Sequence, residues 1–328
     1  MIDRFLPLTD AKPVHDLWMR SLGSNYPISE RVFGQNIHGN PHYESGDGLV
    51  VRQDNKVIGF CLTRIRRTAS RKDTPREGGI VALLIDPVHQ RQGLGAKMLE
   101  HAEMLLQRQG ITSLTAGACG LYRLWPGIPT DLEGAHAFFA SHGYEMERGV
   151  FDLVRNLRDY TQPQSVVDTI QRESVRIEPA SEDDVAPLLA FERREFSGWE
   201  AGMRVMCAAG DTDHIILVRD HGRIIGSLQT FSPASRFRAV NVAWEMLLGE
   251  DMGGMAAVGV AESHRGRGLG LALCGVASEI LKSRGVGQCH IDWTSLVDFY
   301  GRLGYNPWRE YWMASKKLEP SATATTSA

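Results

Sequence analysis

Between residues 255 and 270 the chain reads Met255-Ala256-Ala257-Val258-Gly259-Val260-Ala261-Glu262-Ser263-His264-Arg265-Gly266-Arg267-Gly268-Leu269-Gly270. The first six residues are small or apolar, as in a buried strand, and a polar turn leads from them into an apolar segment. The glycines of the turn let its backbone approach a ligand without a Cβ in the way. The free N–H groups at the start of a helix favour an anion, typically a phosphate. This stretch therefore predicts a strand, an anion-binding turn and a helix.

The same pattern occurs earlier in the chain, as Ile80-Val81-Ala82-Leu83-Leu84-Ile85-Asp86-Pro87-Val88-His89-Gln90-Arg91-Gln92-Gly93-Leu94-Gly95. Each copy is followed by an aromatic pair and a helix-ending glycine, first in Phe138-Phe139-Ala140-Ser141-His142-Gly143-Tyr144 and later in Phe299-Tyr300-Gly301-Arg302-Leu303-Gly304-Tyr305. A spacing of roughly 175 residues indicates a duplicated domain and not a solenoid repeat. The length of 328 residues also predicts two domains.

The predicted domain boundaries follow from local composition. Segment 159–174 is polar and contains Pro163, so we interpret it as a linker. The domains then cover residues 1–158 and 175–318, and the Ser-, Thr- and Ala-rich residues 319–328 are expected to form a flexible tail. The first copy has about 14 extra residues, which we place in a Gly- and Pro-rich loop at residues 117–130.

Composition excludes several classes of protein. The net charge of −3 argues against a nucleic-acid binder that works by bulk electrostatics. The chain has neither an apolar run long enough for a membrane span nor the apolar segment of a signal peptide. Five cysteines without a C-x-x-C pair favour reduced thiols over a zinc ribbon or a disulfide framework. We therefore expect a cytoplasmic protein with a small-molecule substrate, no metal site and no nucleic-acid or membrane partner; a homodimer is left open.

Together these motifs resemble the GCN5-related N-acetyltransferase (GNAT) superfamily, twice over. Gln90-Arg91-Gln92-Gly93-Leu94-Gly95 and Arg265-Gly266-Arg267-Gly268-Leu269-Gly270 are similar to the family's pyrophosphate loop for coenzyme A, and the segment from Phe299 to Tyr305 resembles its second hallmark. The resemblance implies an α/β fold with a splayed central sheet in two tandem domains, and acetyl-CoA as the cofactor. It also implies that the pantetheine arm pairs with the strand before the loop, at Val258, Gly259 and Val260 or at Leu83, Leu84 and Ile85.

The resemblance further indicates which copy is catalytic. The family commonly uses a tyrosine at the position of Tyr300 as the acid that protonates the leaving thiolate. A phenol with a pKa of about 10 can protonate a thiolate whose conjugate acid has a pKa of about 8.5. The first copy has Phe139 at this position, which has no proton to donate. We therefore expect the C-terminal domain to be catalytic and the N-terminal domain to be a non-catalytic copy, and whether that copy holds acetyl-CoA is left open.

The base that accepts the amine proton has two candidates. Asp292 ends the strand before the Tyr300 helix, and Glu245 lies on the segment that enters the strand Met255–Val260. A water chain without a dedicated base is the alternative. His290 shares a strand face with Asp292, because side chains alternate with a period of two, so a proton relay through this pair is a further option.

The acceptor is predicted from the extra loop. Trp125 in this loop is an aromatic platform that suits the apolar face of an amino sugar. The loop, together with Trp293 beside Asp292, is similar to tandem acetyltransferases that act on glucosamine. We expect direct acetyl transfer to a small-molecule primary amine such as glucosamine in a ternary complex. The alternatives are an aminoglycoside, a polyamine or an amino-thiol conjugate as acceptor, a different acyl group, or a coenzyme-A-binding sensor or interaction module without turnover.

Overall fold

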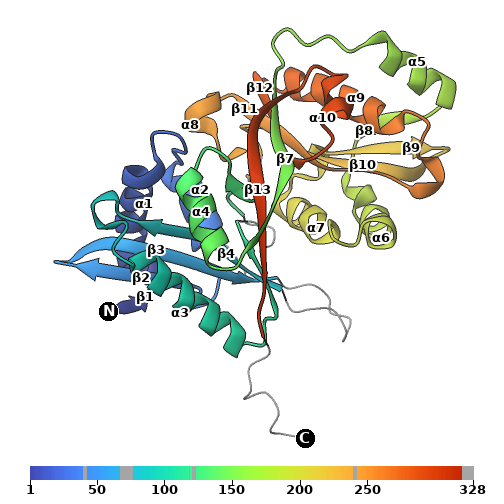
Figure 1. Ribbon diagram of the computed structural model, residues 1–328. Coiled ribbons are helices and arrows are strands. Elements are labelled where there is room, and N and C mark those ends of the chain that lie inside the picture. Colours follow the sequence, from blue (N-terminus) through green and yellow to red (C-terminus); the bar gives the residue numbers. More distant parts are fainter. Residues whose placement is uncertain (40–42, 67–76, 118, 120–122, 239–241, 320–328) are drawn as a thin grey trace, which may run out of the picture. The chain divides into compact units, whose positions relative to one another are not determined.

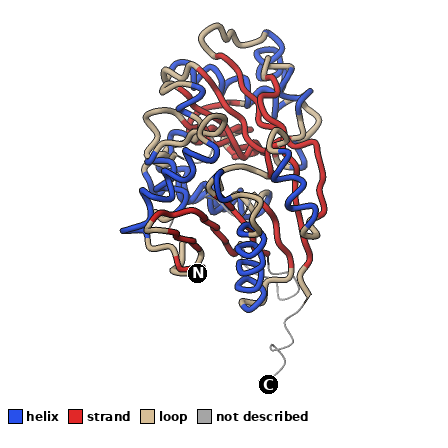
Figure 2. The backbone as a smooth tube through the Cα atoms, turned by 60° about the vertical axis from the view of Figure 1, so that its left-hand side comes forward, coloured by secondary structure: helices blue, strands red, loops and turns tan. Residues whose placement is uncertain are grey.

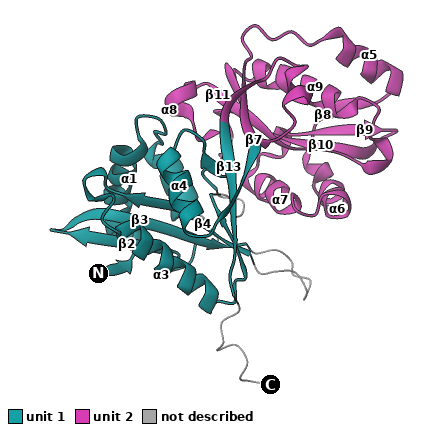
Figure 3. Ribbon diagram, viewed as in Figure 1, with its two compact units in different colours: residues 1–150, 310–328 teal, residues 151–309 magenta. Residues whose placement is uncertain are grey.

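The computed structural model describes residues 1–39, 43–66, 77–117, 119, 123–238 and 242–319. The chain forms two compact units, one of Met1–Val150 with Glu310–Ala328 and one of Phe151–Arg309 (Figure 3). Each unit contains strands and helices in a mixed α/β arrangement, which confirms the predicted fold class (Figure 1). The predicted tail lies outside the described residues from position 320 onward.

The first unit is built on strands in the order β1-β2-β3-β4-β5-β13, in which only the β4–β5 pair is parallel. Its strands are β1 (Ile2–Arg4), β2 (Gly48–Gln53), β3 (Lys56–Ile65), β4 (Glu77–Ile85), β5 (Ser113–Ala116) and β6 (Ile128–Pro129), with the first part of β7 (Glu145–Asn156) and the last part of β13 (Asn306–Lys317). Its helices are α1 (Pro7–Leu22), α2 (Glu30–Ile37), α3 (Leu94–Arg108) and α4 (Glu133–Ser141).

The second unit repeats this plan in the order β8-β9-β10-β11-β12-β7, again with one parallel pair, β11–β12. Its own strands are β8 (Arg176–Pro179), β9 (Ile215–Asp220), β10 (Arg223–Phe231), β11 (Met252–Val260) and β12 (Gln288–Thr294). Its helices are α5 (Gln164–Glu173), α6 (Val185–Glu195), α7 (Glu200–Ala209), α8 (Glu245–Leu248), α9 (Leu269–Ser283) and α10 (Val297–Gly301).

The last strand of each unit pairs with a strand that is distant in the sequence. In the first unit β13 pairs with β5, with Ala314 opposite Ala116. In the second unit the part of β7 from residue 151 onward pairs with β12, with Leu153 opposite Ile291. The compact units therefore divide the chain at Val150 and Arg309, whereas the polar composition of residues 159–174 led us to boundaries at residues 158 and 174.

Both sheets are splayed at the same point. The parallel pairing of β4 with β5 ends at Ile80 opposite Ala116, while β4 continues along β3 to Ile85. The pairing of β11 with β12 ends at Met255 opposite Ile291, while β11 continues along β10 to Val260. The last residues of β4 and β11 therefore lose their parallel neighbour, and the sheet opens beside them. The splayed sheet expected from the family resemblance is confirmed.

Helices lie beside the strands in both units (Figure 2). In the first unit Leu99 of α3 and Cys61 of β3 belong to one buried cluster. The neighbouring residue Phe60 points to the other face, where its ring lies 5.4 Å from Phe5. In the second unit α9 supplies much of the buried cluster, and Val166 of α5 lies only 2.8 Å from where a Cβ on Gly275 of α9 would be. The segment interpreted as a linker thus contains a helix that packs closely on α9.

Candidate active site

The two glycine turns begin helices α3 and α9, as predicted. Gly93 and Gly268 cap these helices with φ angles of 78° and 84°, a left-handed conformation that favours glycine. Gly266 is also left-handed, at 75°, and its counterpart Arg91 adopts the same conformation at 61° despite its side chain. The first N–H groups of each helix have no acceptor within the helix and are free to bind an anion.

In each turn, one side chain donates a hydrogen bond to the backbone of the preceding strand. The amide of Gln90 donates to the carbonyl of Ile85 at 3.0 Å, and Nε of Arg265 donates to the carbonyl of Val260 at 3.1 Å. Gln90 and Arg265 occupy equivalent positions in the two copies. The turn thus keeps its geometry in both units although its side chains differ.

The turn of the second unit is also covered by α5. Nε of Arg267 lies 2.6 Å from a carboxylate oxygen of Glu173, and the Arg172 guanidinium donates to the carbonyl of Arg267 at 3.1 Å. A Cβ on Gly268 would lie 3.3 Å from the Thr169 side chain. Glycine at 268 therefore keeps the backbone accessible in a crowded position, which suits a coenzyme diphosphate, and two guanidinium groups lie close by.

A cavity of about 390 Å³ opens beside this turn. It lies between the end of β11, the start of α9 and the short helix α10. It brings together most of the residues predicted for coenzyme binding in this domain, and the predicted acid: Val258, Val260, Arg265, Gly266, Gly268, Leu269, Gly270 and Tyr300. Gly259 and Arg267 are not among its lining residues; a Cβ on Gly259 would lie 2.5 Å from the Phe196 ring.

Tyr300 lies at the wall of this cavity and is 6% exposed. Its pKa is raised above the ordinary value of a phenol, first by burial and then by the nearby Cys274 and Asp292. The phenol therefore keeps its proton at neutral pH. The neighbouring Phe299 packs over Gly270, with ring atoms 3.5 Å from where a Cβ would be.

The two predicted bases, Asp292 and Glu245, lie on different elements, β12 and α8. Asp292 is 8% exposed, and its charge contributes to the raised pKa of Tyr300. Glu245 is the half-buried first residue of α8. Neither lines the described cavities. The influence of Asp292 on Tyr300 indicates that it lies near the acid.

Asp292 and Trp293 form a bulge in β12. The register passes from Ile291 opposite Leu153 to Thr294 opposite Phe151, so two residues oppose the single residue Asp152. Trp293 has a left-handed φ of 51°. Its N–H donates to Oδ1 of Asp152 at 3.1 Å.

His290 pairs with Asp152 and not with Asp292 as the strand alternation suggested. Nε2 of His290 lies 3.3 Å from Oδ2 of Asp152, and both side chains are almost completely buried. Sequence analysis missed Asp152, because it lies on β7, far from β12 along the chain, and no local motif marks it.

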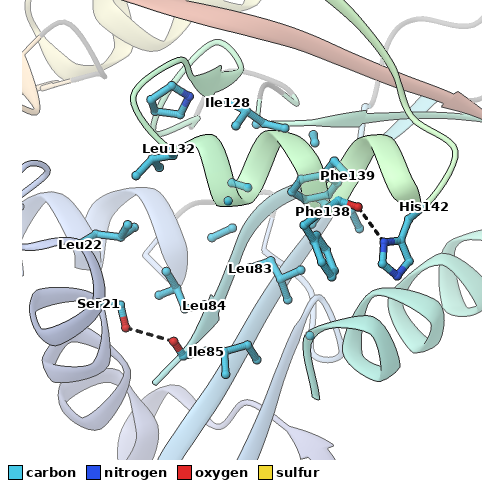
Figure 4. Close-up of a pocket in the computed structure, with 18 of the residues that line it drawn as sticks. Ser21, Leu22, Leu83, Leu84, Ile85, Ile128, Leu132, Phe138, Phe139 and His142 are labelled. Carbon is cyan, nitrogen blue, oxygen red and sulfur yellow. Dashed lines mark hydrogen bonds between the residues drawn. The ribbon is translucent and has the colours of Figure 1, made fainter. Parts of the chain in front are cut away.

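The first unit has a larger cavity, of about 680 Å³. Leu83 and Phe138 are among the apolar residues that surround it (Figure 4). It is lined by most residues of the predicted first coenzyme site, namely Leu83, Leu84, Ile85, Gln90, Arg91, Gly93 and Gly95; Gln92 and Leu94 do not line it. Among the described residues that line it there is no aspartate, glutamate or tyrosine, and Phe139 lies where the second copy has Tyr300. The first cavity therefore has an anion-binding turn but none of the acid and base candidates of the second unit.

Trp125, predicted as a substrate platform, also lines the cavity of the first unit. Its ring stacks on Trp18 at 5.1 Å and meets the Tyr26 ring edge-on at 5.6 Å. Only 7% of the residue is exposed. Part of its loop, residues 118 and 120–122, lies outside the described residues. Trp293, the other predicted substrate residue, is partly buried in the bulge of the second unit.

Within the described part of the chain, no three His, Cys, Asp or Glu side chains are grouped so that they could hold a metal ion. No helix in the same residues has both the length and the apolar character needed to cross a membrane. All five cysteines are free thiols.

Comparison with known proteins shows that two regions of the chain match the same family. The sequence profile described as the Acetyltransferase (GNAT) family matches residues 12–144 and 178–305. No curated protein matches the chain. Among solved structures, a GCN5-related glucosamine N-acetyltransferase region of a fungal multi-domain GH3 beta-N-acetylglucosaminidase is 28% identical, with a TM-score of 0.89. That match covers 96% of this chain but only 38% of the fungal chain, so this chain spans less than two fifths of that protein.

Two further structures share the fold over almost the whole chain. A GCN5-related N-acetyltransferase from Sphaerobacter thermophilus is 16% identical with a TM-score of 0.69, and the match covers 98% of this chain and 96% of that one. A tandem GNAT protein from the clavulanic acid biosynthesis pathway is 15% identical with a TM-score of 0.64, and the match covers 98% and 99% of the two chains.

Proposed function

Because the chain belongs to the acetyltransferase (GNAT) family and has one such domain in each unit, we propose that it transfers an acetyl group from acetyl-CoA to a small-molecule primary amine. The observation that carries this proposal is the cavity of the second unit. It joins an anion-binding turn, the free end of a splayed strand and a buried, protonated tyrosine. These are the parts needed to hold an acyl coenzyme and to protonate its leaving thiolate.

The second unit would hold the coenzyme through its backbone. The N–H groups at the start of α9 and the Arg265 side chain suit the diphosphate. The end of β11, at Val258, Gly259 and Val260, is paired with β10 on one side only, so its other edge is open to the pantetheine arm, apart from the Val260 carbonyl that Arg265 bonds. Acetyl-CoA supplies the activated acetyl group.

The residues of the second unit divide the proton transfers between them. Tyr300 donates a proton to the leaving sulfur, which its place in the cavity supports; its raised pKa keeps the hydroxyl protonated before the reaction. Asp292 is our preferred acceptor of the amine proton, since it is the carboxylate whose charge acts on Tyr300; Glu245 is the alternative. The amine then attacks the acetyl group directly in a ternary complex, and the N–H of Val260 is our candidate donor to the thioester oxygen.

The first unit would bind the coenzyme without turning it over. Its cavity has an exposed Arg91 beside the start of α3, but Phe139 cannot donate a proton. In our proposal, the alternative of a coenzyme-A-binding sensor without turnover therefore applies to the first unit alone.

Glucosamine is the acceptor we propose to test first. The support is the 28% identical fungal region described as a glucosamine N-acetyltransferase.

Five free thiols favour a reducing compartment such as the cytoplasm for this protein.

The experiment is a thiol-release assay with acetyl-CoA and a panel of glucosamine, aminoglycosides, polyamines, amino acids and cysteine conjugates. We expect wild-type turnover on glucosamine and a fall of kcat by about 10²–10⁴ in Tyr300→Phe, with coenzyme affinity unchanged. Tyr305→Phe is the matched control, because it removes a buried hydroxyl that bonds to Ser278 and does not line the cavity. A Tyr300→Phe enzyme within about threefold of wild type would contradict the proposed acid.

A further inference from the structure

We propose that Asp152 is a positioning residue of the second unit, whose carboxylate fixes the β12 bulge that contains Asp292. The inference rests on the proposed function, in which Asp292 accepts the amine proton. It concerns a residue on β7, outside the segment 178–305 that the family profile matches in this unit.

The bulge is a local departure from regular strand geometry. Asp292 and Trp293 together oppose Asp152, and Trp293 holds a left-handed φ of 51°. This conformation is strained for a residue with a Cβ and persists only where its surroundings hold it. Bulges commonly re-aim a side chain next to an active site.

Asp152 supplies contacts on both sides of Asp292. Its Oδ1 accepts the N–H of Trp293 at 3.1 Å, and its Oδ2 lies 3.3 Å from Nε2 of His290. One carboxylate therefore accepts the backbone N–H of the residue after Asp292 and lies close to the side chain of the residue two before it, whose ring nitrogens have no hydrogen-bond partner among the described residues. With 1% of Asp152 exposed, water cannot easily replace these contacts.

His290 is itself held firmly. The residue is completely buried, and its ring meets the Trp308 ring edge-on at 5.7 Å. The Asp152 carboxylate thus joins a fixed side chain to a strained backbone segment. Loss of that link would let β12 relax toward a regular strand, in which a one-residue change of register turns the following side chains to the other face.

The test measures kcat, KM and structure in Asp152→Ala and Asp152→Asn of the full chain. Asp152→Ala removes both contacts, and we expect kcat to fall at least tenfold while KM for acetyl-CoA stays within about twofold. Asp152→Asn keeps an oxygen for the Trp293 N–H, and we expect it to recover most of kcat. This separates positioning from a need for the negative charge.

Asp10→Ala is the matched control for lost stability. Asp10 is 3% exposed, accepts the N–H of Leu6 and pairs with Arg52, all within the first unit. We expect it to lower the unfolding temperature without lowering kcat at temperatures where the protein stays folded. Equal losses of kcat in Asp10→Ala and Asp152→Ala, or wild-type kcat in folded Asp152→Ala, would overturn the proposal.

A crystal structure of Asp152→Ala gives a readout that does not depend on turnover. We expect Trp293 to leave its left-handed conformation and Asp292 to move away from Tyr300; an unchanged bulge would overturn the positioning role. If the wild-type chain acetylates no amine, the proposed function fails, and the crystal structure still decides whether Asp152 holds the bulge.

Discussion

A buried carboxyl group in the second unit should make the stability of that unit depend on pH. Glu192 of α6 is completely buried, and one of its oxygens accepts a hydrogen bond from Ser227 of β10. The other oxygen has no hydrogen-bond partner among the described residues. Burial raises the pKa of Glu192 from 4.5 to about 7, against a smaller opposite effect of the Ser227 hydroxyl.

The sign and size of the effect follow from the two pKa values. Below pH 4.5 the carboxyl is protonated in both the folded and the unfolded chain, so its contribution to stability is fully present. As the pH rises from 4.5 to about 7, the unfolded chain releases the proton while the folded chain keeps it. Each pH unit in this interval removes about 1.4 kcal/mol of unfolding free energy, or about 3 kcal/mol in all, and above pH 7 the contribution stays flat.

Glu192→Gln removes the titrating group and keeps its shape. We expect the unfolding free energy of wild type, measured with urea, to fall by about 3 kcal/mol relative to Glu192→Gln between pH 4.5 and pH 8. Glu182→Gln, which changes an exposed carboxylate in the same unit, should leave the pH dependence of wild type intact. Parallel stability curves for wild type and Glu192→Gln would refute the reasoning.

Two further substitutions test the stability of the first unit and the coenzyme affinity of the second unit. Trp125→Ala should destabilise the first unit by about 3–5 kcal/mol, because it removes a buried indole stacked on Trp18. Thermal unfolding measures this loss. A large rise in KM for the amine with little loss of stability would instead support the predicted substrate platform. Glu173→Gln should tighten coenzyme A binding to the second unit about two- to fivefold at low salt, since Arg267 loses a competing carboxylate. Calorimetry measures that affinity, and an unchanged value at both low and high salt would show that Arg267 does not act on the coenzyme phosphates.

Local features of the fold could be predicted from the sequence. The strand, the turn and the helix around Gly93 and Gly268 follow from residues adjacent in the chain, and both glycines cap helices as expected. The duplication itself is visible because these local motifs recur.

Long-range pairing could not be predicted in the same way. Nothing local in the sequence indicates which neighbouring strands β7 and β13 join. The Asp152–His290 pair depends on that choice, because β7 brings Asp152 opposite the β12 bulge. Sequence alternation suggested Asp292 as the partner of His290, since it could compare only residues of one strand.

The polar composition of residues 159–174, and Pro163 within them, explain why the segment that contains α5 was interpreted as a linker. Val166 is its only fully buried residue, and the remaining surface is largely polar. Pro163, which suggested a break, stands at the N-cap of the helix, next to the position where proline is well tolerated. The contact of α5 with the anion-binding turn was therefore not foreseen.

The central claim is that the second unit carries out the chemistry. The most direct test compares the steady-state turnover of Gly268→Glu and Gly93→Glu with that of wild type, on the amine that the panel identifies. Both substitutions place a bulky negative charge at a left-handed helix cap that is expected to bind phosphate. Loss of turnover in Gly268→Glu with retention in Gly93→Glu is the predicted result; full turnover in Gly268→Glu with loss in Gly93→Glu would move the active site to the first unit and contradict the account.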